Sequence, residues 1–201
     1  MQTEARIEDN RQRLRIPVGG WKDGIMDFCA FGPFHSSLCL SLCCPLISLG
    51  QIFTRLGLNW HVEPSDNPRS HLAFKVMVSI SVFYFTVLNF FGDPSKGSQI
   101  ASHYIYLLHL FLVTILAGKT RAYIRNAYDI PATVSKSAAD MCSIDESTIP
   151  PVVDCMEDYV CSCVCAPCVI SQMNRHTAMY DTYDSSYCSS NGMPKYAPMM
   201  V

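Results

Sequence analysis

The sequence has few charged residues, and neither sign of charge predominates. Of its 201 residues, 16% are Asp, Glu, Lys or Arg, whereas soluble domains have roughly 25%. Fifteen basic residues are balanced by seventeen acidic ones, so the chain lacks the basic surface that nucleic-acid binding requires. Hydrophobic residues make up 49% of the chain. This composition argues against a disordered chain, a nucleic-acid-binding protein and a soluble hydrolase, and it favours a small membrane protein.

Several sequence signals are also missing. The first twenty residues, MQTEARIEDNRQRLRIPVGG, contain no apolar core, which argues against a secretory signal peptide. The chain contains no P-loop, dinucleotide-binding glycine loop, nucleophile elbow or His-Glu-x-x-His motif. We therefore expect a protein that is not an enzyme. The eleven cysteines make up about 5.5% of the 201 residues, which is less than the roughly 8–10% that is typical of a secreted disulfide scaffold.

Two long apolar stretches predict membrane-spanning helices. Residues 72–91 contain one lysine as their only charged residue, and residues 97–118 contain none. A bilayer core about 30 Å thick requires roughly 20 helical residues, and both stretches reach that length. The intervening sequence GDPSKGS is rich in turn residues. The pattern predicts a transmembrane helical hairpin; a helix pair buried in a soluble core is the alternative.

Basic residues lie outside the predicted hairpin. They are Arg55, Arg69 and Lys75 before it and Lys119, Arg121, Arg125 and Lys136 after it. The turn itself contains only Lys96. Because basic residues accumulate on the inner side of membranes, we expect both termini on the cytoplasmic, or equivalent inner, side.

Two further stretches are expected to contact the membrane without a firm prediction of a span. Residues 28–54 lack charge but contain two prolines and two glycines. Such a segment can span with a kink, enter and leave on the same side, or lie along the interface. Residues 159–173 are too short to span, which favours a dip or a surface helix.

Most of the cysteines lie in two clusters that flank the hairpin. The candidate metal ligands among them are Cys39, Cys43, Cys44, Cys155, Cys161, Cys163, Cys165 and Cys168. Thiolates at such spacings ligate Zn²⁺ or another soft divalent metal, and Cys165-x-x-Cys168 has ordinary zinc-ligand spacing. Free cysteines also serve as small core residues or as acylation sites near a membrane. Disulfides are a further alternative, although a reducing compartment disfavours them. The spacings alone do not choose among these roles.

The two clusters repeat a short pattern. Gln51 lies seven residues after Cys44, and Gln172 lies seven residues after Cys165. In both segments a proline lies near the cysteine and an arginine follows the glutamine. This weak internal repeat predicts two half-units that pack together.

Four segments, GGWKDGIMDFC, LCLSLCCPLISLGQI, RAYIRNAYDI and DCMEDYVCSCVCAPCVISQ, resemble the placenta-specific gene 8 family, which includes cornifelin, the plant cadmium-resistance proteins and the cell-number regulators. The motif positions that we expect to be structural are Trp21, Gly24, Asp27, Pro45, Gly50, Gln51, Arg121, Arg125 and Gln172. The further matched positions are Cys44, Tyr128, Asp154, Cys155, Cys165 and Cys168. The family's Cys-Pro-Cys signature is here Cys44-Pro45-Leu46, without the second thiol.

The resemblance implies a plasma-membrane protein connected with heavy-metal efflux, calcium entry or control of cell number or size; an organellar membrane is the other location considered. One hypothesis is a homo-oligomer that handles divalent metal, since two spans cannot enclose a pathway. Its polar groups within the hairpin would be Ser102, His103, Tyr106 and His109. The alternative is a non-catalytic structural subunit of a larger membrane complex. The expected partners are the lipid bilayer and other membrane polypeptides, without nucleic acid, and Zn²⁺ or another soft metal is the one cofactor considered.

The predicted fold is thus an all-α membrane protein, with a transmembrane hairpin flanked by two Cys-rich, membrane-associated helical segments. The predicted divisions are a polar arm (1–20), Cys-rich segment 1 (21–56), a connector (57–71), a transmembrane helix (72–92), a turn (93–98), a second transmembrane helix (99–118), a basic stretch with Cys-rich segment 2 (119–176) and a flexible tail (177–201).

Overall fold

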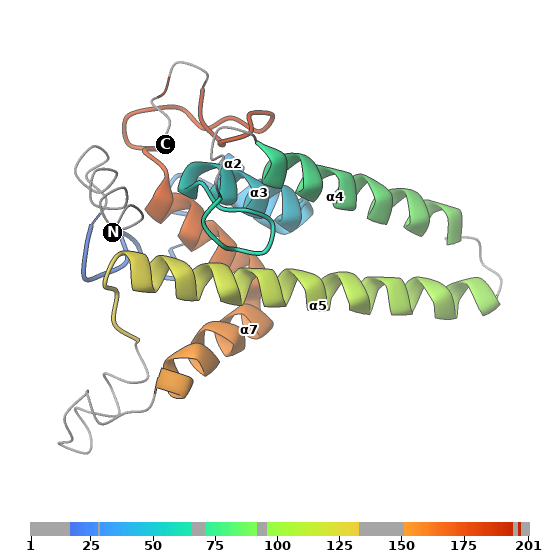
Figure 1. Cartoon of the computed structure of the whole chain (residues 1–201). Coiled ribbons are helices and arrows are strands. Elements are labelled where there is room, and N and C mark those ends of the chain that lie inside the picture. Colours follow the sequence, from blue (N-terminus) through green and yellow to red (C-terminus); the bar gives the residue numbers. More distant parts are fainter. Residues whose placement is uncertain are drawn as a thin grey trace.

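The computed structural model describes residues 17–27, 29–65, 71–91, 96–132, 151–194 and 197. This part of the chain contains five helices and no β-strand, which confirms the predicted all-α class for these residues (Figure 1). The helices are α2 (Ser36–Cys43), α3 (Pro45–Leu56), α4 (Leu72–Phe91), α5 (Lys96–Ala127) and α7 (Pro151–Thr177). The predicted polar arm lies outside the described residues except for residues 17–20.

Helices α4 and α5 run side by side and extend together beyond the other helices (Figure 1). Both are long and apolar enough to cross a membrane, over Leu72–Phe90 and Gln99–Ala127. Only 17% of the most apolar window of each helix is buried, whereas the core helix of a soluble protein is mostly buried. The low burial favours the membrane hairpin over the soluble alternative.

Helix α5 is longer than the sequence predicted. It continues to Ala127, nine residues past the expected end of the apolar span at residue 118. The extension is stabilised by packing on α7, because Thr120, Arg121 and Ile124 are buried there. The first part of the predicted basic stretch is therefore a helical extension of the span.

Both Cys-rich segments contain a helix break at a cysteine. Cys44 separates α2 from α3 with φ −141° and ψ 65°, and Cys165 interrupts α7 with φ −149° and ψ 76°. A proline follows each break, Pro45 at the first position of α3 and Pro167 in the second half of α7. Proline cannot donate the backbone hydrogen bond that a continuous helix requires. The internal repeat of the sequence therefore corresponds to two helix breaks with similar backbone conformations.

Helices α3, α4, α5 and α7 share the main apolar core. Its largest fully buried side chains are Leu46, Leu49, Ile52, Phe53, Met77, Ile124, Ile170 and Met173. Gly50 allows α3 to approach α4 closely, since a Cβ there would lie 3.2 Å from the Cα of Phe74. Gly118 has the same role between α5 and α7, because a Cβ would lie 2.6 Å from the ring of Tyr159.

The structure differs from the flexible tail predicted for 177–201. Residues 178–194 pack back onto the helices, where the side-chain amide of Gln51 donates to the carbonyls of Ser186, Tyr187 and Ser189 at 3.4, 3.3 and 3.0 Å. The hydroxyl of Tyr187 donates to the carbonyl of Phe34. Backbone carbonyls attach this segment to Gln51, and a small apolar cluster that includes Tyr180, Met193 and Phe31 packs beside it.

Candidate functional site

A buried ion cluster lies between α5 and α7. The carboxylate of Asp158 contacts Arg121 Nε at 3.1 Å and Arg125 Nη1 at 3.0 Å. All three side chains are almost completely buried. Burial raises the pKa of Asp158, and the two arginines act in the opposite direction. Two cations around one carboxylate tie the extension of α5 to the first half of α7.

The cluster continues into the N-terminal segment. The guanidinium of Arg121 lies 4.5 Å from the ring centre of Trp21 and donates to the side-chain carbonyl of Gln172. The amide nitrogen of Gln172 donates to the backbone carbonyl of Asp23 at 2.9 Å. Cation–π contact and hydrogen bonding thus attach residues 21–23 to both α5 and α7.

A second buried network joins the two halves of the internal repeat. Arg55 of α3 donates to the backbone carbonyl of Asn174 in α7 at 3.1 Å and to its side-chain oxygen. The amide nitrogen of Asn174 donates in turn to the hydroxyl of Ser48. Burial lowers the pKa of Arg55, which here donates to neutral oxygens. On the same half of α7, Arg175 pairs with Asp23 at 3.2 Å.

His176 is buried at the end of α7. Its Nδ1 accepts a hydrogen bond from the backbone N–H of Lys22 at 3.2 Å, and the rings of Trp21 and Tyr128 pack edge-on against it at 5.1 and 5.2 Å. Burial lowers the pKa of His176 to about 4, and Lys22 adds to the effect. The neutral imidazole is therefore a structural acceptor for the N-terminal segment.

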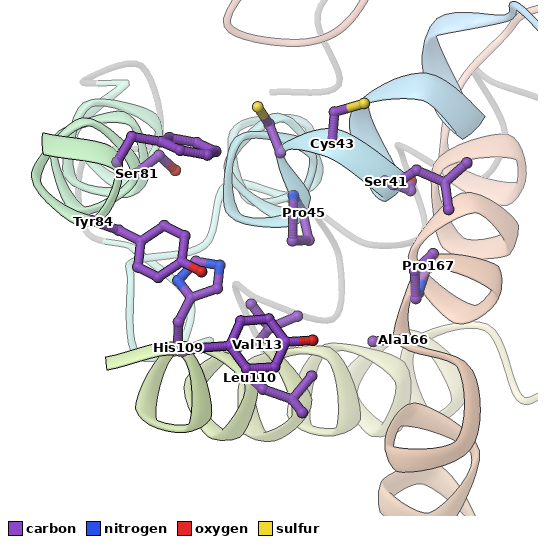
Figure 2. A pocket seen from close by; sticks show the side chains of 14 residues that line it. Ser41, Cys43, Pro45, Ser81, Tyr84, His109, Leu110, Val113, Ala166 and Pro167 are labelled. Carbon is purple, nitrogen blue, oxygen red and sulfur yellow. The ribbon is translucent and has the colours of Figure 1, made fainter. Parts of the chain in front are cut away.

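A cavity of about 260 Å³ lies where the two helix breaks meet the hairpin (Figure 2). We call it the break cavity. It is lined by Ser41, Leu42, Cys43, Cys44, Pro45, Ser81, Tyr84, Phe85, Tyr106, His109, Leu110, Val113, Ala166 and Pro167. Figure 2 shows the ring of Tyr84 over that of His109, and the two are stacked at 3.8 Å between centroids. The cavity is mostly apolar with a few polar groups, the usual character of a ligand pocket.

The structure divides the predicted polar groups of the hairpin. Tyr106 and His109 line the break cavity. His103 lines a separate, open hollow with Gln99, Ile100, Tyr104 and Leu107. The hydroxyl of Ser102 donates to the carbonyl of Gln99 at 2.9 Å within its own helix.

The candidate metal ligands are distributed over several places. Cys43 and Cys44 line the break cavity, Cys39 and Cys161 are half-buried, and Cys163 is exposed. A disulfide joins Cys165 to Cys168, and the side chain of Cys155 lies outside the described residues. Among the residues described, no three His, Cys, Asp or Glu side chains are grouped to hold a metal ion. The metal site thus stays a prediction.

The nine motif residues predicted to be structural all lie at contacts within this framework. Trp21, Arg121, Arg125 and Gln172 belong to the ion cluster and its extension. Gly50 allows the approach of α3 to α4, Gln51 binds the C-terminal segment, and Pro45 begins α3. Asp27 accepts a hydrogen bond from the backbone N–H of Gly24 at 2.9 Å, and the carbonyl of Gly24 accepts one from Arg175 at 3.2 Å.

Sequence reasoning missed the partners of these residues. Asp158, Asn174 and His176 were not singled out as buried groups, although each is at most 1% exposed. One signal pointed to Asp158: Arg121 and Arg125 lie four residues apart, on one face of a helix, and two buried cations require an anion.

The framework occupies the same part of the chain as a family match. The model of the PLAC8 family matches residues 21–176, from Trp21 of the ion cluster to His176 at the end of α7. Searches of curated proteins and of solved structures found no match. The match confirms the resemblance seen in the sequence and covers most of the length of the chain. The chain belongs to the PLAC8 family.

Proposed function

We propose that this protein is a structural integral membrane component that assembles through its hairpin with further copies or with other membrane polypeptides. The observation that carries the proposal is the large apolar surface that α4 and α5 leave uncovered. The exposed large side chains on these helices are Leu72, Val82, Phe83, Phe85, Phe90, Ile100, Tyr104, Tyr106, Leu107, Leu108, Leu110 and Phe111.

The size of this surface supports insertion into a bilayer. Removing one such side chain from water stabilises by about 1.5–3 kcal/mol, so a dozen of them in water would strongly favour aggregation. The ends of the hairpin next to residues 72 and 127 lie on one side (Figure 1), and Arg121 and Arg125 lie at that side. The positive-inside rule then orients both termini towards the inner side, and the family resemblance suggests the plasma membrane.

The small number of helices in the hairpin is the reason to expect assembly. Two helices cannot enclose a pathway or cover their own outer faces, and helix pairs in membranes associate through packing with neighbours. The aromatic side chains on both helices supply a contact surface for such neighbours. The two buried networks join the helices next to the hairpin ends at residues 72 and 127. This part of the protein would form a rigid structure on the inner side of the membrane.

The decisive experiment is the native mass of the full chain after extraction in a mild detergent, with identification of co-migrating polypeptides. Migration as part of a larger assembly, or as a homo-oligomer, is the expected result. A monomer in the detergent micelle, with no companion after gentle extraction and after crosslinking in the membrane, would contradict the assembly role. Release from membranes by alkaline carbonate would contradict integral insertion.

A second candidate function is the handling of a soft divalent metal. It is favoured by one observation, that Cys43, Cys44 and His109 line the same cavity. Thiolate and imidazole are the ligands that Zn²⁺ and Cd²⁺ prefer. The cavity would have to contract around the ion, since these groups are not arranged as a ligand set.

Metal analysis of a matched pair of variants tests this candidate. The double variant Cys43→Ser/Cys44→Ser should lose bound zinc and cadmium tolerance in expressing cells, because both soft ligands are removed. Cys188→Ser, which removes an exposed cysteine elsewhere, should retain both. Equal metal content in the two variants would count against metal handling at this cavity.

A further inference from the structure

The Cys165–Cys168 disulfide spans the break in α7. Cys165 is the non-helical residue at the break, and Cys168 lies in the first turn of the helical half that follows. The two Cα atoms are 5.4 Å apart, and the sequence between the cysteines is Ala-Pro. The pair therefore forms a Cys-x-x-Cys unit placed at the start of a helix.

We propose that Cys165 and Cys168 form a thiol–disulfide exchange site whose substrates are small-molecule or protein thiols and disulfides. This activity goes beyond the proposed membrane role. Both cysteines are half-buried and therefore lie at the edge of the core and not inside it. In addition, the N-terminal end of a helix carries partial positive charge, which stabilises a thiolate in Cys-x-x-Cys units.

The exchange step is balanced without a cofactor. The thiolate of a reducing partner attacks the sulfur of Cys165, forms a mixed disulfide and releases Cys168 as a thiolate, which takes up a proton. A second partner thiol then attacks the mixed disulfide, so that the partner leaves as a disulfide and Cys165 as a thiolate. Two electrons pass from the partner to the protein, and the reverse sequence oxidises the protein.

The other helix break provides an internal comparison. Cys44 has nearly the same backbone conformation as Cys165, but the residue three positions later is Ile47 instead of cysteine. Cys44 is a free thiol. Two similar breaks thus differ in the one feature that exchange requires, a second sulfur in the first helical turn.

The disulfide also borders the break cavity. Ala166 and Pro167, the two residues between the bonded cysteines, line its wall, as do Cys43 and Cys44 of the other helix break. Opening the disulfide removes the covalent link across the break and so frees this part of the wall.

The test is a redox titration of the full chain in native membranes. Membranes are equilibrated in glutathione buffers of increasing oxidised fraction, quenched with acid and labelled with a high-mass maleimide, which counts free thiols on a gel. The expected result is the reversible loss of two labelled thiols in the wild type. Cys165→Ser and Cys168→Ser should each abolish this two-thiol step, and Cys43→Ser should retain it.

A gain-of-function variant gives the test a second arm. Ile47→Cys creates a Cys-x-x-Cys unit at the other break and should add a second two-thiol step. The wild-type titration needs no altered chain, so misfolding of a variant does not weaken it. A pair that stays oxidised in excess dithiothreitol, a pair that stays reduced in fully oxidised glutathione, or a two-thiol step that survives in Cys165→Ser would each overturn the proposal.

Discussion

Asp158 is the carboxylate that both Arg121 and Arg125 contact in the interior between α5 and α7. Without it the two buried guanidinium groups would lie close together with like charge and would lack the carboxylate that both contact. Breaking a buried pair by removing one partner leaves the other charge uncompensated, and this is more costly than the loss of a surface pair. The position of this one side chain therefore determines whether the extension of α5 can pack on α7.

Asp158→Asn should lower the free energy of unfolding by about 3–5 kcal/mol. The measurement is thermal unfolding of the purified protein in detergent, followed by circular dichroism. Asp181→Asn is the matched control, because Asp181 pairs with Lys22 at the surface and is 60% exposed; its loss should cost no more than about 1 kcal/mol. Similar effects of the two substitutions would contradict the assigned role of Asp158.

His176 makes stability depend on pH. The unfolded imidazole takes up its proton near pH 6.5, whereas the folded one does so only near pH 4. The contribution of His176 is therefore complete above pH 6.5 and is lost as the pH falls towards 4. At pH 5 the loss amounts to about 2 kcal/mol.

The variant His176→Asn tests this dependence, because its side-chain oxygen can replace Nδ1 as the acceptor for Lys22 but does not titrate. Its stability should change less between pH 7 and pH 5 than that of the wild type. The check is the difference in midpoint of thermal unfolding between the two pH values. An unchanged difference would show that other groups cause the dependence.

At the scale of single residues, the sequence predicted positions better than partners. The nine motif residues all lie at contacts of the framework, but these contacts join residues that are far apart in sequence, such as Arg121 and Gln172. Asn174 and His176 are polar, and polar residues usually lie at the surface. No local pattern distinguishes the few that are buried, because burial depends on which helices meet.

At the scale of elements, the sequence predicted the hairpin, and the prolines marked both helix breaks. The length of α5 was underestimated because the prediction ended where the charged residues begin. A helix continues past that point when another element covers its polar side chains, and here α7 does so. The packed path of residues 178–194 was also missed, since its hydrogen bonds to Gln51 and its few buried apolar side chains follow no regular hydrophobic period.

The close approach of α3 and α4 depends on Gly50. Gly50→Ala places a Cβ 3.0 Å from that of Met77 and 3.2 Å from the Cα of Phe74. Since a backbone atom cannot move aside without shifting α4, the substitution should destabilise by about 1–3 kcal/mol. Gly20→Ala is the control, because no atom lies within 4 Å of its added Cβ, and its effect should stay within about 0.5 kcal/mol. Unfolding midpoints in the same detergent compare the two; equal midpoints would contradict the tight interface.

At the scale of the whole molecule, the proposed insertion of the hairpin implies one orientation in the membrane. A glycosylation acceptor sequence with a flexible spacer, inserted between α4 and α5, should be modified in microsomes, because the proposed orientation places the turn in the lumen. The same insert in the N-terminal arm should remain unmodified. Modification of the insert in the N-terminal arm but not of the insert in the turn, seen as a shift in gel mobility, would contradict the proposed topology.

The hydrogen bonds of Gln51 can form only late in the synthesis of the chain. The Gln51 amide donates to carbonyls 135 to 138 residues further along the chain, so these partners are synthesised only after all five helices. Until then a side chain that is 1% exposed in the finished structure lacks these three acceptors. A premature stop after α7 would spare every helix and the whole of the matched region, yet it would leave this amide uncovered. Such a truncated chain is a candidate for quality-control degradation during biogenesis, despite retaining both candidate membrane-spanning helices.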